Sequence, residues 1–205
     1  MIKTVLLVLS ISLSAFAGNT NSSPYIDDVI DSISADLDKD GIKDLVYLSK
    51  PEKQAQEDYD LWFKISSEGE FYKVEGAVAV YNDGIEYSLQ VNEAGSVQMI
   101  TNSNSPWSRG SWIETQTYAY RKGTLVLAGY TYQEMDDFQE YYSTCDINLL
   151  SRKGTYVGND LVNGGTFEVR KEDVLSVDEV SFYSLQETYI WGEYCSNSHE
   201  GNEEE

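Results

Sequence analysis

The chain has 205 residues, a length that suits one folded domain with a short additional segment. Its 35 acidic residues outnumber its 14 basic residues, and the formal net charge is −21. A protein with this charge repels nucleic acid and anionic membrane surfaces, so we expect neither as a partner. The single histidine, His199, lies in the acidic C-terminal end. One histidine excludes a zinc site built on several histidines, and its position argues against a Ser-His-Asp or Cys-His arrangement.

The N-terminus has the composition of a secretory signal peptide. A positive start at Lys3 precedes an apolar run from Thr4 to Phe16, and Ala15-Phe16-Ala17 fits the small-x-small pattern of a cleavage site. We expect cleavage after Ala17, export to the periplasm or the extracellular space, and a flexible leader over residues 18–23. No later segment reaches the roughly 20 apolar residues that a transmembrane helix needs, so we expect no membrane insertion.

The segment after the leader has the spacing of a short helix. Apolar residues recur at Ile26, Val29, Ile30 and Ile33, and Pro24 suits the start of a helix. We therefore expect a short N-terminal helix over residues 25–33 that leads directly into an aspartate-rich loop.

The aspartate-rich loop has the spacing of a calcium site. Its four aspartates fall at alternating positions and then at position 9 of the loop: Asp36, Asp38, Asp40 and Asp44. Gly41 supplies the sharp turn that lets carboxylates converge, and Ile42 would offer its backbone carbonyl. An EF-hand also needs a glutamate at its last position, where this chain has Tyr47, so we exclude an EF-hand. The loop must therefore complete calcium coordination with water or a distant group.

Electrostatics also favours a metal ion in this loop. Two carboxylates about 4 Å apart repel by roughly 4 kcal/mol at an effective dielectric constant of about 20, so four of them cannot converge without a cation or protons. The alternative is a solvated acidic turn in front of a strand, because Asp and Gly are ordinary turn residues. We expect one calcium ion, held by the side chains of Asp36, Asp38, Asp40 and Asp44 and by the carbonyl of Ile42.

The loop resembles the calcium loop of FG-GAP and related integrin-like repeats of bacterial secreted proteins. The resemblance rests on the run Ala35-Asp36-Leu37-Asp38-Lys39-Asp40-Gly41-Ile42-Lys43-Asp44-Leu45-Val46. In that family the loop joins two strands and its aspartates bind calcium, which implies the same ligands in this chain. No second copy of the motif is present, so we do not expect a multi-bladed propeller. The stretch from Trp107 to Leu150 is similar to uncharacterised bacterial exported proteins that carry one such loop.

Short β-strand patterns, separated by turn residues, follow the loop to the end of the domain. We expect strands at 45–48, 59–65, 77–81, 85–91, 96–101, 112–120, 125–132 and 167–170, with an aromatic-rich segment at 138–150. Turns are expected at Glu68-Gly69, at Asn82-Asp83-Gly84, around Gly95, at Arg121-Lys122-Gly123-Thr124, at Lys153-Gly154 and at Asn163-Gly164-Gly165. The pattern predicts an all-β fold, a mostly antiparallel sandwich or barrel-like sheet with a short N-terminal helix. One β domain is expected over residues 24–195, with an acidic, disordered tail over residues 196–205.

The two cysteines, Cys145 and Cys195, both follow the predicted cleavage site. In an oxidising compartment we expect them to form a disulfide, and the alternative is two free buried thiols.

Aromatic residues are the other unusual feature, with 16 tyrosines and four tryptophans. In the predicted strand 112–120, one face carries Trp112, Glu114, Gln116, Tyr118 and Tyr120. Such a face can stack on sugars or anchor a protein, or it can simply build the core. We expect an exposed loop around Trp107 and Arg109, and these two residues with Trp112 are the candidate partner contacts.

These observations lead to a functional hypothesis and two alternatives. The leading hypothesis is an exported, calcium-binding β domain that acts without catalysis, as a binding or interaction module for a protein or a glycan. The first alternative is a carboxylate-dependent hydrolase of envelope polysaccharide, for which the sequence does not select a pair of carboxylates. The second is a periplasmic inhibitor or immunity-type protein whose acidity suits a basic toxin.

Overall fold

The computed structural model describes residues 18–20, 29–50, 58–78, 84–103, 110–136, 141–160 and 165–172. Within these ranges the chain forms twelve β-strands in two antiparallel sheets, and no helix. The predicted all-β class is therefore confirmed for the described part of the chain.

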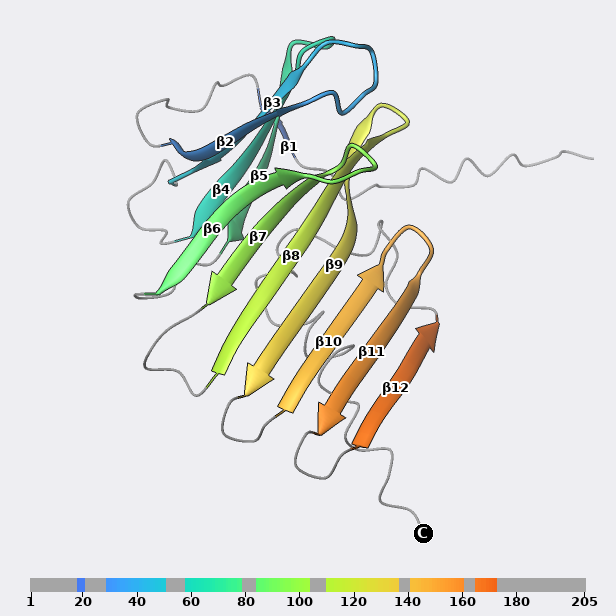
Figure 1. Cartoon of the computed structure of the whole chain (residues 1–205). Helices are drawn as coiled ribbons and strands as arrows, with labels where there is room; N and C mark the ends of the chain where they lie inside the picture. The colour runs from blue at the N-terminus through green and yellow to red at the C-terminus, as the bar shows by residue number, and fades with distance from the viewer. Residues whose placement is uncertain are drawn as a thin grey trace, which may run out of the picture.

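Both sheets are built mainly from strands that follow one another along the chain (Figure 1). Sheet A has the order β1-β5-β4-β3-β2 and contains β1 (Gly18–Thr20), β2 (Val29–Ala35), β3 (Asp44–Ser49), β4 (Tyr59–Ile65) and β5 (Glu70–Val78). Sheet B has the order β12-β11-β10-β9-β8-β7-β6 and contains β6 (Ile85–Val91), β7 (Val97–Ser103), β8 (Gly110–Arg121), β9 (Thr124–Asp136), β10 (Tyr141–Asn148), β11 (Lys153–Asp160) and β12 (Gly165–Glu172). From β2 to β5 and from β6 to β12, the sheets are up-and-down meanders.

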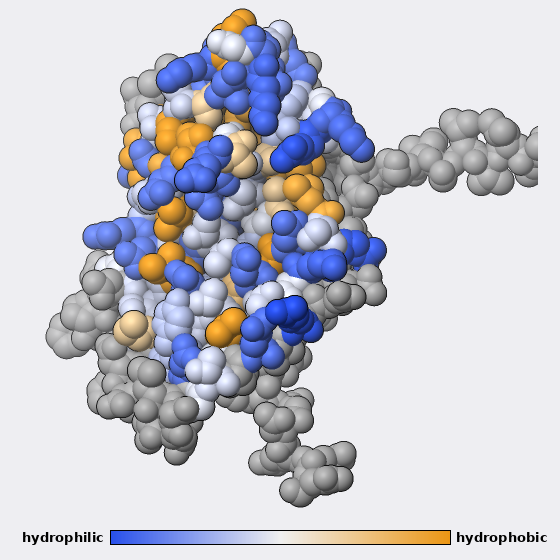
Figure 2. Space-filling view, turned by 45° about the vertical axis from the view of Figure 1, so that its right-hand side comes forward, coloured by the Kyte–Doolittle hydropathy of each residue, from blue (hydrophilic) through white to orange (hydrophobic). Residues whose placement is uncertain are grey.

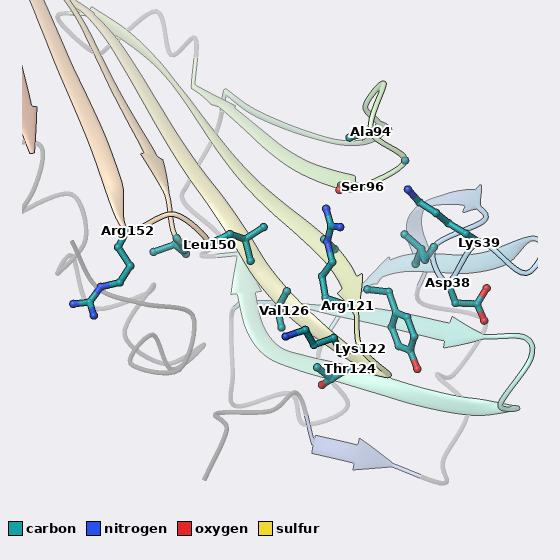
Figure 3. Close-up of a pocket in the computed structure, with 15 residues that line it drawn as sticks. Asp38, Lys39, Ala94, Ser96, Arg121, Lys122, Thr124, Val126, Leu150 and Arg152 are labelled. Carbon is teal, nitrogen blue, oxygen red and sulfur yellow. The ribbon is translucent and has the colours of Figure 1, made fainter. Parts of the chain in front are cut away.

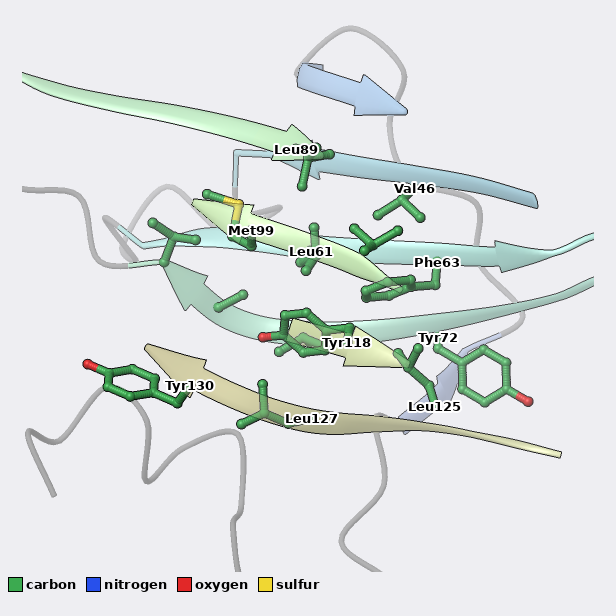
Figure 4. Close-up of a cluster of buried hydrophobic side chains, with 14 of the residues drawn as sticks. Val46, Leu61, Phe63, Tyr72, Leu89, Met99, Tyr118, Leu125, Leu127 and Tyr130 are labelled. Atoms are coloured by element: carbon green, nitrogen blue, oxygen red, sulfur yellow. The ribbon is translucent and has the colours of Figure 1, made fainter. Parts of the chain in front are cut away.

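One apolar core lies between the two sheets (Figure 4). Successive side chains of a strand point to opposite faces, so the alternating apolar residues of each sheet turn towards the other sheet. Phe63 of β4 meets Tyr118 of β8 with ring centroids 5.4 Å apart, and Tyr59 of β4 meets Tyr87 of β6 edge-on at 5.2 Å. Tyr118 is fully buried, so this tyrosine is part of the core. The sequence suggested this as the alternative to a role of the aromatic strand face in binding a partner.

A side chain also links the sheets where β2 and β6 lie side by side. The backbone N–H of Leu89 in β6 donates a hydrogen bond of 2.8 Å to Oδ2 of Asp31 in β2. The pairing of β2 with β3 shifts register between Val29 and Asp31, beside this contact. At the opposite edge of sheet B, strands β10 to β12 continue the meander away from β6 (Figure 1).

The helix predicted over residues 25–33 is not a helix where the structure describes it. Residues 29–33 lie in strand β2, and residues 25–28 lie outside the described residues. The apolar spacing fits both periods, because Val29 and Ile33 also lie on one face of a strand. Ile30, which suggested the helical period, is 39% exposed on the other face of β2.

Most other strand predictions are confirmed, but the sequence patterns did not predict β11 or the part of β5 before residue 77. β4 and β6 have the predicted bounds. The turn predicted at Lys153-Gly154 is wrong, because these residues begin β11 and the turn lies one step earlier, with Arg152 at a φ of 57°. Residues 18–20 of the expected flexible leader form β1, which pairs with β5.

A buried polar network crosses between the sheets beside the core. Gln116 Nε2 donates to the carbonyl of Ala77 in sheet A at 3.1 Å and to Glu114 Oε1 at 2.8 Å. The Tyr118 hydroxyl donates to Gln116 Oε1 at 2.6 Å, and the Tyr130 hydroxyl donates to Glu114 Oε2 at 3.1 Å. Burial raises the pKa of Glu114 above the ordinary glutamate value, and the hydrogen bonds from Gln116 and Tyr130 oppose this only in part.

The raised pKa of Glu114 predicts a specific pH dependence of stability. A group that binds its proton more tightly in the folded state contributes most below its unfolded pKa, about 4.3 for glutamate, and this contribution is lost as pH rises through the folded pKa. The variant Glu114→Gln lacks this titration. We therefore expect its free energy of unfolding, relative to wild type, to increase as pH rises from about 4 towards neutrality. Urea unfolding at a series of pH values measures the difference, and a constant difference would contradict the prediction.

Candidate metal centre

The aspartate-rich loop joins β2 to β3 and is shaped by hydrogen bonds from its own backbone. The N–H of Gly41 donates to Asp36 Oδ2 at 3.1 Å, the N–H of Asp40 donates to Asp38 Oδ1 at 3.2 Å, and the N–H of Ile42 donates to Asp40 Oδ1 at 2.6 Å. Gly41 has a φ of 88°, a conformation that only glycine adopts without strain. The predicted turn at Gly41 is therefore confirmed, and it folds the aspartates towards one another.

Three of the four predicted carboxylates converge. Asp36, Asp38 and Asp40 each offer one carboxylate oxygen, and these three oxygens lie within 4.8 Å of one another. Two oxygens on opposite sides of a calcium ion, each about 2.3–2.6 Å from it, are roughly 5 Å apart. The three oxygens can therefore belong to one coordination sphere, and the group can hold a metal ion.

One oxygen of this group is buried without a hydrogen-bond partner. Asp36 Oδ2 accepts the bond from Gly41, but Oδ1 is shielded from solvent and accepts no hydrogen bond within the described part of the chain. A buried, unpaired carboxylate oxygen is costly, and such an atom in a native structure calls for a bound ion or water. Asp36 Oδ1 is thus the atom in the loop whose burial a bound cation or water would satisfy.

The fourth predicted ligand, Asp44, has a different place. Its side chain is fully buried at the start of β3 and does not belong to the group of three. Oδ2 accepts the backbone N–H of Leu37 at 2.8 Å, and Oδ1 accepts the backbone N–H of Ser66 at 2.8 Å. Asp44 therefore fastens the loop to the β4–β5 turn. The spacing of the aspartates predicts Asp44 as a metal ligand and does not reveal these two hydrogen-bond donors.

The β4–β5 turn contributes residues that the spacing of the loop does not reveal. The Ser67 hydroxyl donates to Asp38 Oδ2, and the Ser66 hydroxyl donates to the carbonyl of Lys43 at 2.8 Å. The bond from Ser67 is the main cause that lowers the pKa of Asp38, and the N–H of Asp40 adds to it, while partial burial opposes both. Asp38 is therefore held in its charged form, which is the form that binds a metal.

Ile42 lies at the outer edge of the loop, with a side chain that is 56% exposed. Its N–H donates to Asp40, and the role predicted for its carbonyl stays a prediction. An exposed apolar side chain at this position fits a residue whose backbone, and not its side chain, serves the loop.

The other residues singled out in the sequence lie outside the aspartate-rich loop. Trp107, Arg109 and Cys195 lie outside the described residues. Trp112 is half-buried in β8 and stacks on Tyr132 of β9, with ring centroids 6.1 Å apart. Cys145 is buried in β10, opposite Tyr132 and Tyr156 of the neighbouring strands.

The described part of the chain contains no helix long and apolar enough to cross a membrane. Comparison of the whole chain with protein-family models, with curated proteins and with solved structures finds no match.

Proposed function

We propose that the protein is an exported β domain that binds calcium and acts as a non-enzymatic binding module for a protein or a glycan. The observation that carries the metal part is the buried, unpaired Oδ1 of Asp36 within a group of three converging carboxylates. Calcium suits the group better than zinc, because calcium prefers several oxygen ligands and zinc prefers histidine and cysteine.

In this proposal Asp36, Asp38 and Asp40 hold the ion, and the carbonyl of Ile42 and water complete its coordination. The ion supplies positive charge, and its role is structural. Because Asp38 also accepts the bond from Ser67, the ion would fasten the β2–β3 loop to the β4–β5 turn. The loop joins two strands, β2 and β3, and does not follow the predicted helix.

Calcium should stabilise the wild-type protein and not the variant Asp36→Asn. A ligand present at about 100 times its dissociation constant adds roughly 2.7 kcal/mol to stability, and magnesium should add less because it needs a tighter octahedron. In chelator, we expect Asp36→Asn to be at least as stable as wild type, because the substitution removes a buried charge that repels its neighbours. Thermal melts in calcium, magnesium and chelator measure both effects.

Two further variants distinguish an effect on metal binding from an effect on the hydrogen bonds that hold the loop in place. Asp44→Asn should lose stability in chelator as well as in calcium, because Asn has only one acceptor oxygen for two buried N–H groups. Glu86→Gln removes an exposed charge at the start of β6 and should respond to calcium as wild type does. If wild type melts at one temperature in all three conditions, the metal site does not exist.

A partner can be sought directly through the dependence of binding on calcium. The proposal expects a protein or glycan from envelope extracts to be retained by the immobilised protein, with different recovery in calcium and in chelator. The candidate contacts for such a partner are Trp107, Arg109 and Trp112. The same extract separates this role from inhibition of a basic toxin, since retention of a basic protein that falls steeply with salt supports the inhibitor.

The hydrolase alternative has one observation in its favour. Glu114 has a raised pKa, as a general acid does, and Glu134 lies on the neighbouring strand two residue pairs further along. Both oxygens of Glu114, however, accept hydrogen bonds within the polar network, and this favours a structural role for the side chain. Turnover of envelope polysaccharide that is lost in Glu114→Gln would support the hydrolase.

The exported form should lack residues 1–17 and should contain a Cys145–Cys195 disulfide. Cys145 is buried on the core side of sheet B, so the bond would fasten residue 195 to that face. Closing a loop of about 50 residues contributes roughly 4 kcal/mol in the chain-entropy model. Intact mass and non-reducing peptide mapping of natively exported protein test both features. A mature protein that begins at Met1, or two thiols that react with an alkylating reagent, would refute the respective part.

A further inference from the structure

Several turns meet at one end of the molecule and surround an open groove. In an up-and-down meander every second turn lies at the same end of the sheet, so the β6–β7, β8–β9 and β10–β11 turns of sheet B are neighbours. The β2–β3 loop of sheet A lies beside them (Figure 3). The groove between these turns has a volume of about 870 Å³, which is within the usual range for small-molecule sites.

The rim of this groove is basic in a strongly acidic protein. Lys39, Arg121, Lys122 and Arg152 line it, four of the 14 basic residues of the chain. Asp38 is the one acidic residue among those that the structure places around the groove. Lys39, Arg121 and Lys122 are exposed and form no ion pair with other described residues. Their charges are therefore available to an anion.

Three of the four cations have a backbone conformation that is uncommon for residues other than glycine. Lys39, Lys122 and Arg152 have φ values of 65°, 53° and 57°, and within the described ranges they are the non-glycine residues in the left-handed conformation. Glycine, asparagine and aspartate adopt this conformation more readily than lysine or arginine. These residues lie in the β2–β3, β8–β9 and β10–β11 turns, so each of these turns carries one of the cations to the rim of the groove.

The floor of the groove is apolar. Leu37, Ala119 and Leu149 are buried beneath it, and Leu150 is 49% exposed beside Val126 (Figure 3). Figure 2 shows that hydrophobic patches lie between hydrophilic groups on one face of the molecule. Thr124, which also lines the groove, has a buried hydroxyl with no hydrogen-bond partner among the described residues. The groove thus combines basic side chains, a hydroxyl group that has no hydrogen-bond partner among the described residues, and apolar surface.

We propose that this groove binds an anionic amphiphile, a small molecule with a phosphate or carboxylate head and an apolar body. The head pairs with the cations of the rim, and the body lies on Leu150 and Val126. A single small molecule fits better than an anionic membrane surface, because the net charge of −21 repels such a surface. This assignment names a ligand class beyond the proposed function. The groove shares Asp38 with the candidate metal centre, so its test keeps calcium constant.

Calorimetric titration of the full mature chain with octyl phosphate, below its micelle concentration and in one calcium-containing buffer, tests the assignment. We expect one molecule to bind, with inorganic phosphate and the uncharged octyl glucoside each at least about tenfold weaker. Arg121→Gln should weaken octyl phosphate about tenfold, the effect of losing one charged hydrogen bond. Leu150→Ser should weaken octyl phosphate and leave inorganic phosphate unchanged.

The matched control is Arg170→Gln. Arg170 is an exposed cation on β12 that pairs with Glu168 at 2.9 Å and lies outside the groove, so its loss should leave binding unchanged. Thermal melts confirm that each variant is folded. Equal affinity for octyl glucoside, no effect of Arg121→Gln, or binding to phosphatidylglycerol vesicles without binding to octyl phosphate would each overturn the proposal.

Discussion

The Asp44 carboxylate joins two hairpins of sheet A, and the candidate metal centre depends on it. Oδ2 accepts the N–H of Leu37 in the β2–β3 loop, and Oδ1 accepts the N–H of Ser66 in the β4–β5 turn. A fully buried carboxylate is tolerated only when its oxygens are paired, and here each oxygen is paired with a different segment. Neither segment can move away without leaving a buried charge unpaired. One side chain therefore fixes where the loop begins relative to the neighbouring turn.

This fixed frame explains why three more carboxylates stay close together. With the ends of the loop held, and with Ser67 bound to Asp38, the loop cannot open to relieve the repulsion between Asp36, Asp38 and Asp40. The loop backbone pairs with one oxygen of Asp36 and leaves the other buried and unpaired. The repulsion and the unpaired oxygen are two independent reasons for a cation at the same place. A solvated acidic turn would account for the exposed side chain of Asp40, but not for the buried Oδ1 of Asp36.

The sequence predicted the parts of this structure that depend on local patterns. Alternation of apolar and polar residues, interrupted at Trp62 in β4, predicted the bounds of β4 and β6. The spacing of the aspartates predicted the three that converge. The pattern predicted the wrong element for residues 29–33. Apolar residues there fit the period of a helix and also that of a strand, and pairing with β3 makes this segment the strand β2. The role of Asp44 could not be predicted from local patterns. Its second hydrogen-bond donor, the N–H of Ser66, lies 22 residues away in sequence and comes close only because β3 pairs with β4.

Turns of both meanders place four basic residues around one groove of a strongly acidic protein. The net charge of −21 acts at long range, and it keeps large polyanions such as nucleic acid and membrane surfaces away. At physiological ionic strength, however, exposed charges are screened beyond about 8 Å. A small anion inside the groove therefore experiences mainly the nearby charges, which are the cations Lys39, Arg121 and Lys122 and the carboxylate of Asp38, and less the distant acidic residues. An acidic protein with a local basic groove can thus admit one small anion while it rejects extended anionic surfaces. This selectivity follows from the distance dependence of the electrostatic interaction.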